Sequence, residues 1–202
     1  MENYFQMNFD METFDNSVSE GNPFIFANAT NVDSIEVEGV KKGFFNGVIL
    51  NNSIDFPWPD IDFYFSSQEA HRECDFLGNV IRWPIIHKNV MDVIIQNNIQ
   101  GVSFYPVNLI DSCTNEKNRN YYLLFINNLI DAFDMEKSQY KYNEKYNFYT
   151  FVPKKTFLNI NNCGKYDIFR AEKSPSLIFV SDKFKKIIEA YKFSGFGFSI
   201  QK

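Results

Sequence analysis

The sequence predicts an α+β fold, in which a mostly antiparallel or mixed sheet carries two main helices at about residues 87–97 and 181–191. One observation is the aromatic content of 18%, with 23 Phe in 202 residues, because aromatic side chains suit the half-buried surface of a sheet. A second is that strand-like segments outnumber the two clear helical ones, which favours α+β over an alternating α/β order. A third is a strand–helix–strand pattern that occurs twice, at residues 85–104 and 179–198.

The two copies of this pattern align without a gap. The aligned pairs include Ile86 with Val180, His87 with Ser181, Val90 with Phe184, Ile94 with Ile188, Gly101 with Gly195 and Phe104 with Phe198. Each predicted helix has one apolar face that it must bury against another element. We therefore expect both strand–helix–strand units to pack on one shared sheet.

Residues 1–74 form a β-rich N-terminal part. Strand patterns occur at residues 4–9, 23–27, 34–40, 48–50 and 60–65. In the third of these, Ile35 and Val37 lie on one face, and Glu36 and Glu38 lie on the other. The polar segment at residues 66–74 predicts a capped turn that leads into a short helix.

Residues 75–202 form the part that contains the repeat. In its first copy, His87 starts the helix, and Gly101 allows the tight turn that follows it. The helix face spaced at i, i+3 and i+4 holds Val90, Val93 and Ile94. Pro106 predicts that the next strand is broken at an edge or a bend, because proline cannot donate to a ladder.

The pattern of the chain between the two copies predicts strands separated by polar turns. Its predicted elements are a solvated loop at 111–120, a central strand at 121–126, its continuation at 127–133, a turn at 134–138, a strand at 146–152 and a strand at 167–170. Residues 121–126 are continuously apolar, which predicts a strand buried on both faces.

The second copy has a clearer helix start than the first. Ser181 is a favourable N-cap, and Asp182 lies at the positive end of the helix dipole. The predicted core face of this helix holds Phe184, Ile187, Ile188 and Tyr191. Its lysine-rich opposite face is interpreted as solvated surface rather than as a polyanion site.

Composition predicts one soluble globular domain over residues 1–202. Hydrophobic residues make up 45% of the chain and charged residues 22%, which excludes a disordered class. The net charge of −5 argues against nucleic acid as a partner and is compatible with a basic protein partner. Three irregularly spaced cysteines, no apparent signal peptide and no long apolar run predict a cytoplasmic location without a membrane span.

No motif for catalysis, cofactor binding or metal binding stands out, and we assign no residue to any of these roles. The pair His71 and Cys74 lacks the two further ligands that a zinc site needs nearby. Asp131, Asp134 and Glu136 are candidates for acid–base chemistry together with His87, but the same acidic run also suits a polar turn. We interpret His87 as a helix cap.

The order of several segments resembles the bacterial immunity-protein families eleven and forty-three of polymorphic toxin systems. The segments that carry the resemblance lie at residues 75–77, 101–107, 121–124, 131–138, 168–170, 180–182 and 195–198. His87 departs from the serine-like cap expected at the first helix. The resemblance implies a protein that is not an enzyme and that binds a cognate toxin domain, thereby protecting its own cell.

If the protein has this role, exposed acidic and aromatic side chains are candidates for the contact with the toxin. They are Glu36, Glu38, Trp58, Asp60, Asp62 and Tyr64. Aromatic anchors with a charged rim suit a tight interface. The alternatives are an enzyme that uses Asp131, Asp134 and Glu136, and a structural module that self-associates through its aromatic surface.

Overall fold

The computed structural model describes residues 3–10, 24–32, 58–70, 72–145, 147–152 and 154–201. Within these residues the protein is rich in strands, with three helices and with sheets that contain both parallel and antiparallel pairs. This arrangement agrees with the predicted α+β class. The strand patterns expected at 34–40 and 48–50 lie outside the described residues.

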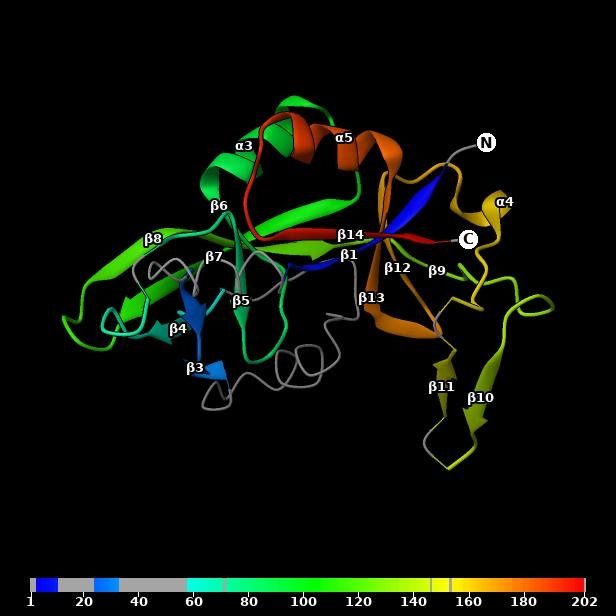
Figure 1. The fold of residues 1–202 in the computed structure, drawn as a ribbon, viewed down its shortest axis with the longest axis horizontal. Helices are drawn as coiled ribbons and strands as arrows, with labels where there is room; N and C mark the ends of the chain where they lie inside the picture. The colour runs from blue at the N-terminus through cyan, green and yellow to red at the C-terminus, as the bar shows by residue number, and fades with distance from the viewer. Residues whose placement is uncertain are drawn as a thin grey trace.

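A seven-stranded sheet forms one half of the molecule (Figure 1). In spatial order its strands are β2 (Phe26–Ala27), β5 (Phe76–Asn79), β6 (Ile85–His87), β8 (Lys117–Ile126), β7 (Val102–Asp111), β4 (Asp62–Phe65) and β3 (Ala29–Thr30). The pairs β2–β5 and β4–β7 are parallel, and the other pairs are antiparallel. The predicted central strand is β8, which is buried over most of its second half.

A five-stranded sheet forms the other half, and a separate two-stranded sheet projects from it. The five strands are β14 (Phe196–Gln201), β1 (Tyr4–Phe9), β13 (Ser174–Ser181), β12 (Ile168–Ala171) and β9 (Leu129–Ile130). The projecting sheet pairs β10 (Tyr140–Asn143) with β11 (Phe148–Phe151). The third helix is a single turn, α4 (Ile160–Cys163).

The two longer helices, α3 (Lys88–Gln96) and α5 (Asp182–Ala190), lie on the same side of the sheets (Figure 1). Both begin as their caps predict. The His87 ring accepts a hydrogen bond from the Asn89 amide, and the Ser181 hydroxyl accepts one from the Phe184 amide. Each helix ends near a glycine with positive φ, 79° at Gly101 and 83° at Gly195.

One hydrophobic cluster buries both helices. It contains Val90 and Ile94 from α3 and Phe184 and Ile188 from α5, together with residues from strands of both sheets. Each of these four side chains is 1% exposed or less. Because the helices share this cluster, it connects the two sheets into one core.

The two strand–helix–strand segments have the same strand arrangement, but they lie in different sheets. β6 and β7 flank the antiparallel strand β8, just as β13 and β14 flank the antiparallel strand β1. His87 lies opposite Tyr121, and Ser181 lies opposite Tyr4. The expectation of one shared sheet was therefore wrong, because each segment pairs around its own central strand.

The central strands also make similar contacts at these matched positions. The Tyr121 hydroxyl donates to the Cys74 carbonyl at 3.1 Å, and the Tyr4 hydroxyl donates to the Cys163 carbonyl at 2.8 Å. Both tyrosines are 1% exposed or less. Burying a tyrosine is favourable when its hydroxyl finds such an acceptor.

Several local predictions were wrong because tertiary contacts decide these segments. Where a helix was expected at 66–74, residues 67–69 form a single turn, and Arg72 pairs with Phe24 as an isolated β-bridge. The predicted loop at 111–120 is shorter, since β8 already starts at Lys117. Residues 127–133 do not continue the central strand, and within them Leu129 and Ile130 form β9 of the second sheet.

A further prediction fails at Tyr191, and another holds only in part at Pro106, where the expected edge is present but the expected break is not. Tyr191 is 53% exposed instead of facing the core, because it is the C-cap of α5 and stacks on Phe193. β7 runs through Pro106 without a break. Its pairing with β4 begins only at Asn108, so Pro106 lies at a local edge.

Candidate functional site

Four of the six predicted contact residues lie on β4 or directly before it. On this strand Phe63 is buried, whereas Asp62 and Tyr64 are half-buried on the opposite face. The alternation predicted for residues 60–65 is thus correct. Asp60 is exposed and Trp58 is half-buried, while Glu36 and Glu38 lie outside the described residues. We call Trp58, Asp60, Asp62 and Tyr64 the β4 patch.

Trp58 is held in place by a hydrogen bond and by ring stacking. Its indole Nε1 donates to the Pro106 carbonyl at 2.8 Å, at the point where β7 has no second neighbouring strand. Its ring stacks on Tyr105 with 4.3 Å between the centroids. A half-buried, immobilised tryptophan loses little side-chain entropy on binding, which makes it a suitable anchor.

The Asp62 carboxylate is engaged with its own protein. It accepts a hydrogen bond from the Asn108 side-chain amide at 2.7 Å and lies 3.5 Å from the Lys117 ammonium. The Tyr64 hydroxyl donates to it at 3.5 Å, and burial together with the Asp62 charge raises the pKa of Tyr64. Asp62 therefore orders this surface, whereas Asp60 presents an exposed carboxylate.

The end of the neighbouring strand β7 carries a second organised carboxylate, Asp111. It accepts hydrogen bonds from the backbone amides of Cys113 at 3.0 Å and Ser67 at 3.1 Å, and from the Thr114 hydroxyl at 2.9 Å. These bonds, that from Cys113 first, hold the pKa of Asp111 well below its usual range. Asp111 is thus a structural cap for two loops beside the β4 patch.

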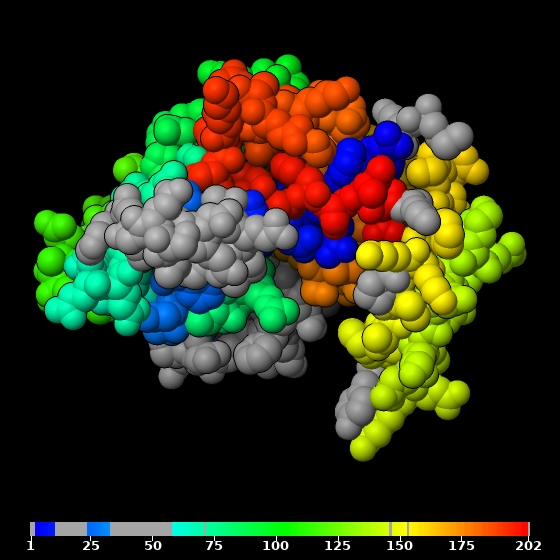
Figure 2. Space-filling view, in the orientation of Figure 1, coloured from blue at the N-terminus to red at the C-terminus, as the bar shows by residue number. Residues whose placement is uncertain are grey.

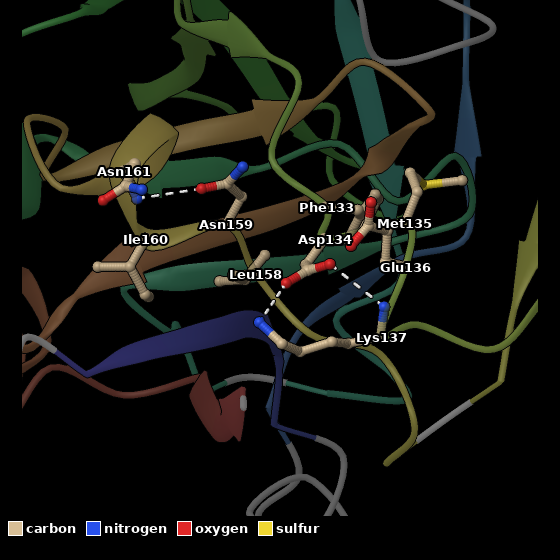
Figure 3. A pocket seen from close by; sticks show the side chains of 9 residues that line it. All are labelled: Phe133, Asp134, Met135, Glu136, Lys137, Leu158, Asn159, Ile160 and Asn161. Carbon is tan, nitrogen blue, oxygen red and sulfur yellow. Dashed lines mark hydrogen bonds and ion pairs between the residues drawn. The ribbon is translucent and has the colours of Figure 1, made fainter.

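Only two of the four residues proposed for an enzyme line a common pocket. Asp134 and Glu136 line an open pocket of about 590 Å³ formed by residues 133–137 and 158–161 (Figure 3). The hydrogen bond from the Lys137 ammonium to the Asp134 carboxylate, at 2.6 Å, lowers the pKa of Asp134. Asp131 is paired with Lys173 instead, and His87 caps α3 beside the other sheet.

The buried thiols are unsuited to nucleophilic chemistry. Burial raises the pKa of Cys74 and of Cys163 to about 12, so both stay protonated near neutral pH. Cys113 is exposed, and the Ser66 hydroxyl lowers the pKa of its thiol. In the described part of the chain, no group of three His, Cys, Asp or Glu residues is arranged to hold a metal ion, and His71 lies outside it.

A family model described as "Immunity protein family (Imm11)" matches residues 5–202. The chain belongs to the Imm11 immunity protein family. This confirms the resemblance to family eleven, and the match begins well before residue 75, where the resemblance started. A search of curated proteins found no match.

The structure of this Imm11 family member also shows one exposed surface that the sequence analysis did not identify. This is the projecting hairpin formed by β10 and β11 (Figure 1). β11 lies within the strand predicted at 146–152, whereas β10 was not predicted, although aromatic and polar residues alternate at 140–143. Across the described residues, no helix has the length and apolar character that spanning a bilayer requires.

Proposed function

We propose that this chain is a cytoplasmic bacterial immunity protein that binds a cognate secreted toxin domain and neutralises it, thereby protecting the producing cell. The observation that carries the proposal is the Imm11 family match over residues 5–202. Neutralisation proceeds by binding alone, without turnover of a substrate. The dispersed positions of Asp131, Asp134 and His87 support this passive role.

The β4 patch, together with Glu36 and Glu38, is the first candidate for the toxin contact. Trp58 supplies a fixed aromatic anchor and Asp60 an exposed negative charge beside it. Aromatic residues at the centre of an interface and charges at its rim are the common arrangement in protein complexes. An acidic patch of this kind would attract a toxin domain with a basic surface.

We also propose that the chain is one domain whose core arose from two copies of a strand–helix–strand unit. The corresponding strand order around β8 and β1 supports this, as do the matched positions of Tyr121 and Tyr4. β1 belongs to the second unit, although it comes from the N-terminal part of the chain. The N-terminal part, residues 1–74, and the core, residues 75–202, are therefore one folding unit in this proposal.

Co-expression with the toxin domain encoded by the neighbouring gene tests the proposed function. We expect this chain to restore growth to a bacterial host in which that domain alone stops growth. The control is the Ile94→Asp and Ile188→Asp double variant, which places two carboxylates in the core and should give no protection. Growth arrest that persists at full expression of the folded wild-type chain would contradict the proposal.

A further inference from the structure

The hairpin of β10 and β11, here called the β10–β11 arm, stands away from the body of the protein (Figure 2). Among the strands that the structure describes, those of the arm are hydrogen-bonded to each other and not to either large sheet. An isolated two-stranded hairpin is only marginally stable in water. The fixed conformation of the arm must therefore be stabilised by contacts among its side chains and by its attachment to the body of the protein.

One face of the arm consists of aromatic rings. The antiparallel register places Tyr140 opposite Phe151 and Tyr142 opposite Tyr149, and all four side chains share one face. The centroids of the first pair of rings are 5.9 Å apart, and those of the second pair are 4.6 Å apart. Tyr140 is still 39% exposed and Tyr142 is 45% exposed, while Phe148 on the opposite face is 52% exposed.

The arm is fixed at its base and closed at its tip. At the base, the Phe151 ring lies 4.0 Å from that of Phe133, which belongs to a buried cluster, and the Val152 amide donates to the Gln139 carbonyl at 2.9 Å. At the tip, the Tyr142 hydroxyl donates to the Asn147 side chain at 2.8 Å. The exposed rings are thus already held in position, which reduces the entropy lost on binding.

The arm and the four residues that follow it, 152–155, together carry a charge opposite to that of the rest of the protein. Residues 140–155 contain four lysines and one glutamate, all exposed, so this segment carries a net charge of +3. Since the whole chain has a net charge of −5, the remainder carries −8. Opposite charges across an interface speed association and disfavour wrong partners.

We propose that the β10–β11 arm contacts an acidic, partly apolar face of the cognate toxin domain. This inference rests on the proposed function and adds a second contact surface to the β4 patch. Tyr142 and Phe148, on opposite faces of the hairpin near its tip, enter the apolar part of that face. Lys141 and Lys145 pair with the carboxylates around it. A polyanion such as nucleic acid fits less well, because the remaining charge of −8 would repel it.

The experiment measures the affinity of purified variants for the purified toxin domain encoded beside this chain. The aromatic variant combines Tyr142→Ser with Phe148→Ser, and leaves Tyr140 and Phe151 at the base unchanged. We expect its dissociation constant to rise about 30-fold, the usual effect of losing a hot-spot contact. Its control combines Ile95→Ser with Tyr191→Ser, two similarly exposed residues on α3 and α5, and should change the affinity less than about threefold.

The charge variant combines Lys141→Glu with Lys145→Glu. We expect about tenfold weaker binding at low salt and a smaller difference at high salt, because ions screen exposed charges. The matched control, Lys186→Glu with Lys192→Glu, makes the same change in net charge at one residue within α5 and one just after it. Thermal unfolding of every variant establishes that the body remains folded.

The possible outcomes separate this inference from the proposed function. Loss of affinity in both arm variants with unchanged controls supports the inference. Tight wild-type binding that the arm variants retain overturns the inference and leaves the proposed function intact. Wild-type protein that does not bind the toxin overturns both. The wild type is also tested for self-association and for binding to a single-stranded oligonucleotide. If the arm variants abolish such an interaction while toxin binding persists, the arm belongs to that partner and the inference is overturned.

Discussion

Replacing Gly195 with alanine should lower the free energy of unfolding by about 3–5 kcal/mol, the range of severe strain and overpacking effects. Gly195 has a φ of 83°, which is unfavourable for any residue with a Cβ atom. A Cβ here would also lie 2.4 Å from the Phe76 carbonyl oxygen. The atom that the Cβ would overlap belongs to the backbone and cannot move aside easily. The backbone amide of the same residue, Phe76, donates to the Ser194 carbonyl at 3.0 Å, and this hydrogen bond joins β5 of one sheet to the start of β14 in the other.

Gly197→Ala is the matched control for this substitution. A Cβ at Gly197 would meet its nearest neighbours at 3.5 Å, an ordinary contact distance. We expect a change of less than about 1 kcal/mol in denaturant unfolding, because alanine fits a strand at this site without strain. Equal stability of the two variants would show that the junction at Gly195 does not constrain the fold.

Ile94→Ala should destabilise the protein by about 2–5 kcal/mol, as is usual when a buried isoleucine is truncated. Ile94 is 1% exposed in the cluster that α3 shares with α5. The cavity would open beneath both helices and cannot close without moving one of them. Denaturant unfolding monitored by circular dichroism measures the loss.

The adjacent residue gives the control. Ile95 is 55% exposed on the same helix, and Ile95→Ala should change the free energy of unfolding by less than about 0.5 kcal/mol. The two substitutions remove the same atoms from neighbouring positions, so helix propensity cancels in the comparison. If both variants lost equal stability, the shared cluster would not be what holds α3 in place.

The helices and their ends could be predicted from sequence because local patterns determine them. The spacing of Val90, Val93 and Ile94 identified the buried face of α3, and Ser181 identified the first turn of α5. The aligned glycines Gly101 and Gly195 both adopt positive φ. Strand partners were harder to predict, because β1 pairs with strands more than 160 residues away in the chain.

The candidate surface was predictable only in part. The alternation at residues 60–65 correctly predicted which face of β4 is buried and which faces outward. Nothing in that segment indicated that Asp62 would accept a hydrogen bond from Asn108. Such a contact depends on the parallel pairing of β4 with β7. The strand predicted at 146–152 contains β11, but its partner β10 was missed for a related reason, since the polar residues of β10 resemble a loop until the register aligns Tyr142 with Tyr149.

Titration of the active toxin domain with the purified wild-type chain tests most directly whether this protein neutralises its toxin by binding. We predict that toxin activity falls linearly as the chain is added and is abolished at a fixed molar ratio of chain to toxin. This ratio should not depend on the incubation time. Complete inactivation at a small fraction of that amount, increasing with time, would reveal turnover and contradict passive binding. So would full toxin activity in the presence of excess folded chain.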